Sequence, residues 1–252
     1  MGWPGHLPRV KRSDVVKVSA GSESMSKLNK NIVGCNACPR LVQWREEVAL
    51  VKRKAYLAED YWGKPVTGFG SDNPRLLIVG LAPGAHGANR TGRIFTGDSS
   101  GDWLYGSLHR IGIAKIATST SRNDGQELLQ TRITMAVHCA PPGNAPTIEE
   151  RDNCAPWLRR ELELSLPTAR AFVALGAFAL TALCKTLIDL GHPVPKLKFG
   201  HGAVAKYRHQ GVDYLVLASY HPSQQNTFTG RLTKTQLDLV LKKAGRFAQV
   251  IK

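Results

Sequence analysis

Short apolar runs alternate with segments of helical spacing along most of the chain, and this alternation restricts the fold more than any other feature of the sequence. Four runs are long enough to form strands: residues 75–80, 133–139, 171–175 and 214–219. Because these runs are largely apolar, they predict strands that are buried on both faces. Such strands in alternation with helices are typical of an α/β fold, in which helices cover both faces of a mainly parallel sheet.

The segments between the runs carry helix signals. Residues 100–111, 177–190 and 232–251 have apolar side chains at helical spacing, and a further helix is expected to begin after Thr147. Glu150 follows Thr147 by three positions, which is the pattern of a capping box at a helix N-terminus. The longest apolar stretch, residues 171–184, is shorter than the roughly 20 residues that a membrane-spanning helix needs. We therefore expect no membrane segment.

The first 26 residues differ from the rest, because they are basic, contain two prolines and several serines, and lack apolar periodicity. We expect a disordered basic tail over residues 1–26 and one domain over residues 27–252. The tail lacks the apolar block of a signal peptide, which favours a cytoplasmic protein with reduced cysteines.

The charge of the chain indicates the kind of partner it binds. Its 34 Lys and Arg exceed its 19 Asp and Glu, for a formal net charge of +15. A surplus of this size favours nucleic acid ahead of an anionic membrane or acidic substrates. A basic surface that is merely solvated is the alternative. One small domain with an exposed nucleic-acid face suggests a monomer associated with the nucleoid.

Five cysteines are candidates for metal or redox chemistry. Cys35 and Cys38 form a Cys-x-x-Cys pair before a proline, and Cys139 and Cys154 form a second pair. Four thiolates in two pairs suit a tetrahedral zinc or an iron–sulfur cluster, and the spacing does not separate the two. Scattered structural thiols are the alternative. Cys184, on the apolar face of a predicted helix, is expected in the core.

Loops that follow parallel strands are where such sheets bind ligands, and three of them are rich in Gly, Pro, Asn, His and Thr: residues 81–98, 140–146 and 220–232. Asp98 either caps the following helix or acts in catalysis, and His221 either satisfies a turn or donates to a ligand. Arg90 and Arg93 suit phosphate or base contacts. Arg231 and Lys234 border the last helix and suit a clamp on a phosphate backbone.

Taken together, three motifs resemble the uracil-DNA glycosylase superfamily, and family 5 (type B) most closely. They are residues 80–93, residues 95–98 (Phe-Thr-Gly-Asp) and residues 221–233, which begin with His-Pro-Ser. The resemblance runs from about Cys35 to the C-terminus. It implies a three-layer α/β/α sandwich around a four-stranded, mainly parallel sheet. It also implies that Cys35, Cys38, Cys139 and Cys154 bind a 4Fe–4S cluster.

The resemblance further assigns roles to individual residues. Asp98 and His221 match the catalytic acid and the histidine that donates to the departing base. The base-binding positions fall on Ala82, Gly84, His86, Phe95, Asn144 and His221, with Phe95 stacking on the base and Asn144 reading its edge. Such a site suits cleavage of an N-glycosidic bond, because an aromatic face, edge donors and negative charge near the sugar are what a flipped nucleotide needs.

One departure from the superfamily bears on specificity. Many members carry Asp, Asn or Glu in the first loop, whereas residues 81–85 here contain no carboxylate. Met135 and Ala136 also stand where some relatives have asparagine. We therefore expect catalysis through Asp98 and leaving-group stabilisation, with a range that extends beyond uracil to hypoxanthine and other damaged bases.

These observations predict a monofunctional DNA glycosylase that starts base excision repair. Two other readings stay open. A binding protein for damaged or single-stranded DNA would keep the fold and the affinity without releasing a base. A zinc hydrolase acting on nucleotides would need a His-rich or carboxylate metal site, which the sequence lacks.

Overall fold

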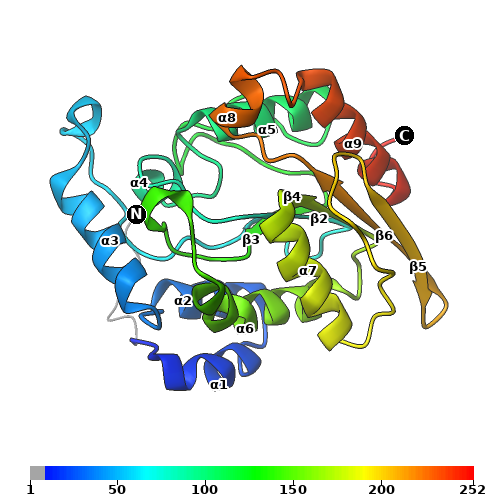
Figure 1. The fold of residues 1–252 in the computed structure, drawn as a ribbon, viewed down its shortest axis with the longest axis horizontal. Coiled ribbons are helices and arrows are strands. Elements are labelled where there is room, and N and C mark those ends of the chain that lie inside the picture. The colour runs from blue at the N-terminus through cyan, green and yellow to red at the C-terminus, as the bar shows by residue number, and fades with distance from the viewer. Residues whose placement is uncertain (1–8) are drawn as a thin grey trace.

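The computed structural model describes residues 9–252, and it forms a six-stranded sheet between two layers of helices (Figure 1). The strands are β1 (Phe69–Gly70), β2 (Leu76–Gly80), β3 (Thr131–Met135), β4 (Ala171–Leu175), β5 (Val204–His209) and β6 (Val212–Ser219). Their order across the sheet is β1-β3-β2-β4-β6-β5. The four central strands are parallel, with Ile78 of β2 opposite Ile133 of β3 and Val173 of β4.

The predicted α/β/α sandwich is confirmed, but the expected count of four strands is wrong. β1 and β5 add antiparallel edges to β3 and β6. Neither edge strand has the continuous apolar pattern of a central strand, because β1 contains two residues and β5 alternates buried with exposed positions. The four predicted runs form the four central strands.

Helices cover the two faces of the sheet in pairs. α5 (Ser99–Arg110) and α9 (Lys234–Phe247) pack on one face with the odd positions of β4. α6 (Ile148–Ser165) and α7 (Ala177–Asp189) pack on the other face with its even positions. Thr147 caps α6 in the predicted capping box with Glu150, and Thr233 caps α9 in the same way with Gln236.

The N-terminal part forms a further layer of helices against α6 (Figure 1). It consists of a 3-10 turn (Arg12–Asp14), α1 (Val15–Ala20), α2 (Met25–Val33) and α3 (Pro39–Val51). Val10 and Val15 are buried in this layer, so the expected disordered tail is wrong for residues 9–26. Too few apolar residues lie there for periodicity to reveal the helix, and the tertiary contact with α6 stabilises it. Residues 1–8 of the expected tail lie outside the described residues.

Short helices complete the chain between the main elements. They are a 3-10 turn at Lys54–Tyr56, α4 (Ala88–Thr91), a 3-10 turn at Pro142–Asn144 and α8 (Gln224–Phe228). Among the described residues, each helix falls short of the length or the apolar character that crossing a membrane demands.

Candidate active site

A cavity of about 680 Å³ opens at the carboxyl ends of the parallel strands. The loop after β2, the turn at Pro142–Asn144 and the segment that follows β6 all contribute to its lining. All seven residues predicted to bind the base or to act in catalysis line it: Ala82, Gly84, His86, Phe95, Asp98, Asn144 and His221. Residues up to 139 positions apart in sequence therefore meet where the sheet topology predicts a ligand site.

Asp98 combines the two roles that the sequence left open. Its Oδ1 accepts a hydrogen bond from the backbone N of Gly101 at 3.0 Å and so caps α5. Its Oδ2 lies against Gly84 and Gly87, where an added Cβ would come within 2.9 and 1.9 Å of that oxygen. Burial raises the pKa of Asp98, because desolvation disfavours the charged form, although the backbone donors of α5 oppose this shift.

His221 and Phe95 form one wall of the cavity. Their ring centroids lie 5.7 Å apart with an interplanar angle of 30°. Phe95 adopts a positive φ of 49°, and its ring packs over Gly80, where a Cβ would lie 2.9 Å from it. Burial lowers the pKa of His221 to about 4, so its imidazole is neutral at pH 7. A neutral imidazole can donate one N–H to a ligand in the cavity.

Asn144 and His86 border the cavity from two other loops. Asn144 is exposed at the end of its turn and has a φ of 56°. His86 Nδ1 lies 3.1 Å from the hydroxyl of Tyr61. Burial, followed by the nearby charges of Arg53 and Arg90, lowers the pKa of His86. The two imidazole rings of the cavity, those of His86 and His221, are thus held toward their neutral forms.

Arg90 and Arg93, predicted to contact DNA, are buried and paired inside the protein. Arg90 forms an ion pair with Glu59 and donates to the carbonyl oxygens of His86 and Gly97 at 2.7 and 2.9 Å. The prediction that these two side chains contact DNA is therefore corrected.

Arg93 binds Asp124 through both terminal nitrogens and also donates to Ser119 and Thr96. This network anchors the loop after β2 to the segment before β3. The Arg93 guanidinium also helps to hold the pKa of Asp124 at about 2, against the opposing effect of burial.

Arg231 and Lys234, the other predicted DNA contacts, are exposed near the start of α9. The guanidinium carbon of Arg231 lies 4.4 Å above the ring of Tyr220, which immediately precedes His221. These two cations therefore remain available to an external polyanion.

Sequence reasoning missed a further wall of the cavity. Arg53 and Tyr56, which lie just beyond α3, also line it. Their segment has no motif and no apolar periodicity, and only the fold shows that it reaches the loop after β2. The basic run at residues 52–54 was the one available signal.

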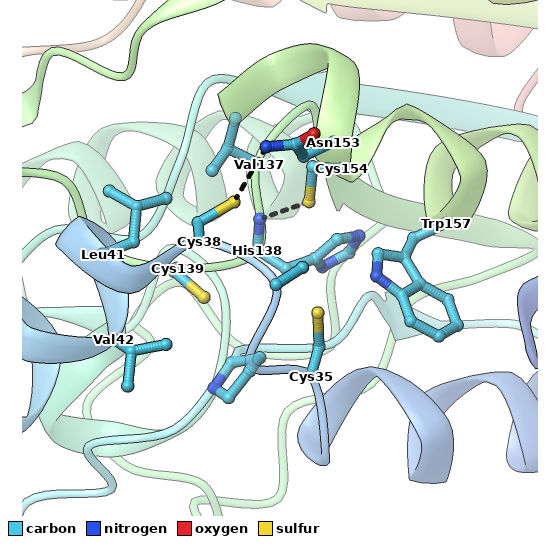
Figure 2. A pocket seen from close by; sticks show the side chains of 12 residues that line it. Cys35, Cys38, Leu41, Val42, Val137, His138, Cys139, Asn153, Cys154 and Trp157 are labelled. Atoms are coloured by element: carbon cyan, nitrogen blue, oxygen red, sulfur yellow. Dashed lines mark hydrogen bonds between the residues drawn. The ribbon is translucent and has the colours of Figure 1, made fainter. Parts of the chain in front are cut away.

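A second, smaller cavity lies at the junction of the N-terminal layer and α6. Cys35, Cys38, Cys139 and Cys154 all line it, and Figure 2 shows their sulfur atoms arranged around it. The cysteines come from three separate segments: the turn before α3, the loop after β3 and the second turn of α6. All four are free thiols, as is Cys184, which lies apart in α7 and packs partly buried against the core, as expected.

Several N–H groups point at these sulfur atoms. Arg45 Nη1 donates to Sγ of Cys139 at 3.0 Å. Figure 2 shows two further contacts: the backbone N of His138 donates to Cys154 at 3.4 Å, and Asn153 donates to Cys38 at 3.8 Å. Burial raises the pKa of Cys139 to about 12, so without a cation its thiol stays protonated. A set of buried thiols that receives N–H donors fits a thiolate-bound metal group, whose charge would favour the thiolates.

Within residues 9–252, no group of three or more His, Cys, Asp or Glu side chains is gathered in the way a metal-ion site requires. One zinc ion would need its four sulfurs at about 2.3 Å from a common centre. A multi-iron cluster spreads its ligands further, because each thiolate binds a different iron.

Comparisons with known proteins agree with this geometry. The family model described as "Uracil DNA glycosylase superfamily" matches residues 67–245. A type-5 uracil-DNA glycosylase of Mycobacterium tuberculosis is 51% identical over 255 residues, which cover 99% of this chain and 93% of the relative. A type-5 uracil-DNA glycosylase of Thermus thermophilus is 48% identical over 87% of this chain and 96% of the relative. A type-4 uracil-DNA glycosylase of Archaeoglobus fulgidus is 32% identical over 63% of this chain and 70% of the relative.

Proposed function

The chain belongs to the uracil DNA glycosylase superfamily, and we propose that it excises uracil from DNA by hydrolysing the N-glycosidic bond. The observation that carries this proposal is the meeting of Asp98, His221 and Phe95 in one cavity. A carboxylate, a neutral imidazole and an aromatic face are the groups that a departing base and an electron-poor sugar require. The relatives named as uracil-DNA glycosylases support uracil as the substrate.

We assign the chemical roles as follows. Phe95 stacks on the flipped base and Asn144 reads its edge. As the bond between C1′ and the base breaks, the electron pair stays on the base, and the neutral His221 donates a hydrogen bond to the developing anion. Asp98, ionised, stabilises the positive charge on the sugar and positions a water. The water adds its oxygen to C1′, and its proton ends on the released base.

The range of bases extends beyond uracil in this proposal. The loop of residues 81–85 carries no carboxylate, so recognition rests on stacking, on Asn144 and on backbone groups near Ala82 and Gly84. Few groups then reject a base of different shape, and hypoxanthine and other deaminated or damaged bases become substrates. The enzyme would act as a monomer and start base excision repair, with Arg231 and Lys234 on the DNA backbone.

We also propose that Cys35, Cys38, Cys139 and Cys154 bind a 4Fe–4S cluster. The N–H donors from Arg45, His138 and Asn153 support this proposal, because such donors stabilise thiolate-bound clusters. When bound, the cluster would supply covalent cross-links between three chain segments, a structural role distant from the reacting atoms.

Substitutions at Asp98 and His221 test the proposed mechanism. We expect Asp98→Asn and His221→Ala to lower the single-turnover rate of base release by about 10²–10³, the usual loss when a group that stabilises transition-state charge is removed. An oligonucleotide with one uracil, scored by alkaline cleavage, gives the rate, and one with hypoxanthine tests the range. Variants that excise at the wild-type rate would overturn the assignment. Wild-type protein that binds but releases no base would favour the binding-protein reading.

Asp98→Asn should also separate catalysis from capping. Asparagine still accepts the bond from Gly101, whereas Asp98→Ala loses the cap, which costs about 1 kcal/mol. Because burial raises the pKa of Asp98 above its unfolded value, its negative charge destabilises the folded state at neutral pH. We therefore expect Asp98→Asn to raise the melting temperature at pH 7 while abolishing most activity. A melting temperature of Asp98→Asn below that of the wild type would show that the negative charge stabilises the fold.

A further inference from the structure

The end of α3 and the segment that follows it carry an unusual surface. Three apolar side chains in it are strongly exposed: Leu50 (83%), Val51 (67%) and Leu57 (60%). Lys52, Arg53 and Lys54 lie among them. Figure 1 shows this segment projecting from the body as a light blue turn beyond α3. We call residues 50–59 the arm.

The arm borders the candidate active site. Arg53 and Tyr56 line the same cavity as Asp98 and His221. Gln224 and Gln225 of α8 line it too, from a different part of the chain. Figure 1 places the arm and α8 on separate sides of α4, so the cavity lies between two projecting segments. A nucleotide that enters it passes close to both.

Arg90 holds the arm against the loop after β2 (residues 81–98), which we call the catalytic loop because it contains Asp98. The guanidinium carbon of Arg90 lies 3.9 Å above the ring of Tyr56, and its Nη1 pairs with Glu59. The same side chain binds the carbonyl oxygen of Gly97, next to Asp98. The arm therefore has a fixed position relative to the catalytic carboxylate.

The cations at the tip of the arm are free to meet a ligand. Its two ion pairs among the described residues are Lys52 with Asp60 and Glu59 with Arg90, and neither involves Arg53 or Lys54. Both of these side chains are exposed. Exposed cations interleaved with apolar side chains match a nucleic acid strand, which presents phosphates beside the faces of sugars and bases.

We propose that the arm is a second DNA-binding surface, with Arg53 and Lys54 on phosphates that flank the flipped nucleotide and with Leu57 against a neighbouring sugar or base. This inference rests on the proposed function, since it takes DNA as the ligand. It adds a contact on the side of the cavity away from α8 and α9. Base flipping requires the flanking backbone to be held, and two anchors on either side of the cavity do this better than one.

The test compares the salt dependence of DNA binding between charge-matched variants of the full chain. Arg53→Gln/Lys54→Gln removes the arm cations, and Lys27→Gln/Lys30→Gln removes two exposed cations from α2, on the far side in Figure 1. On duplex DNA with one uracil, the association constant K falls as salt rises. We expect the magnitude of the slope of log K against log salt to be smaller by about 1.8 for the arm variant, at about 0.9 per phosphate contact. The α2 variant should keep the wild-type slope. Arg231→Gln/Lys234→Gln serves as a reference for the other anchor.

Leu57→Ser provides the second measurement. It should weaken binding without changing the salt slope, because it removes an apolar contact and no charge. An arm variant with the wild-type slope, or equal losses in the arm and α2 variants, would overturn the proposal. If the arm variant lost the binding to phosphatidylglycerol vesicles that the wild type shows, while its DNA binding stayed intact, the arm would instead be assigned to a membrane surface. Wild-type protein that binds DNA but releases no uracil refutes the proposed function alone, and the slopes still test the arm.

Discussion

The carboxylate of Asp98 fits beside the loop after β2 because residue 87 is glycine. A Cβ at Gly87 would lie 1.9 Å from Asp98 Oδ2, so Gly87→Ala must displace the carboxylate or the loop. We expect base release to slow by about 10²–10³, as in Asp98→Asn. Gly106→Ala in α5 is the control, since its Cβ would meet the flexible end of Arg110 at 3.3 Å and the carbonyl oxygen of Ala117 at an ordinary contact distance of 3.7 Å. A Gly87→Ala enzyme with the wild-type single-turnover rate would show that Asp98 needs no such placement.

The pH profile of base release should reflect two pKa values that burial shifts in opposite directions. Asp98 must be ionised to act, so activity rises as pH increases through its raised pKa. His221 has a pKa of about 4 and acts while neutral, so activity should not fall between pH 6 and 7, where an ordinary histidine loses its proton. Single-turnover rates from pH 4.5 to 8 give the profile. A decline centred near pH 6.5 would mean that His221 acts as a cation.

Arg90 and Arg93 show where sequence reasoning at the residue scale stops. A motif places both arginines near the site, but it does not reveal partners such as Glu59 and Asp124, each 31 positions away. Those pairings depend on how two loops meet in the folded chain. His221 and Phe95 were easier to place, because each lies in a loop that follows a recognisable strand.

A buried ion pair joins an element of the sheet to the layer beneath it. Arg132 of β3 and Glu161 of α6 are 1% and 0% exposed, and Glu161 also accepts from Thr134 at 2.5 Å. Glu161→Ala leaves the buried Arg132 with only its longer ion pair to Asp72 at 3.5 Å and a hydrogen bond to Asn29. We expect a loss of about 3–5 kcal/mol in urea unfolding. Glu163→Ala breaks partly exposed pairs on the same helix and should cost less than about 1 kcal/mol. Similar losses for both variants would contradict the distinction.

The sequence predicted central elements better than peripheral ones, for a physical reason. A strand buried on both faces must be apolar throughout, as residues 171–175 are, so its pattern is visible without the fold. Edge strands and short helices depend on their neighbours. β5 exists because it pairs with β6, and α1 because it packs on α6. Neither contact leaves a periodic signal of its own.

At the scale of the whole molecule, the two cavities are connected through α3. Cys38 is the residue before α3, and the arm begins within the last turn of this helix. The cysteine cavity therefore lies at one end of a helix whose other end leads to the wall of the active site. Arg45 lies in the middle of α3, and its side chain donates a hydrogen bond to Cys139. Its backbone carbonyl oxygen accepts a hydrogen bond from the side chain of Asn89 in the catalytic loop. Loss of the proposed cluster should therefore alter the position of the arm.

This connection predicts a specific phenotype for Cys139→Ser. The variant should lose the visible absorbance of an iron–sulfur protein, and trypsin should then cleave faster at the basic residues of the arm, because α3 is no longer cross-linked to β3 and α6. DNA binding should weaken more than the single-turnover rate at saturating protein, since Asp98 and His221 are held by other elements. Cys184→Ser, outside the cavity, controls for loss of a thiol. A colourless Cys139→Ser protein with wild-type protection of the arm and wild-type affinity would show that the cluster acts on neither.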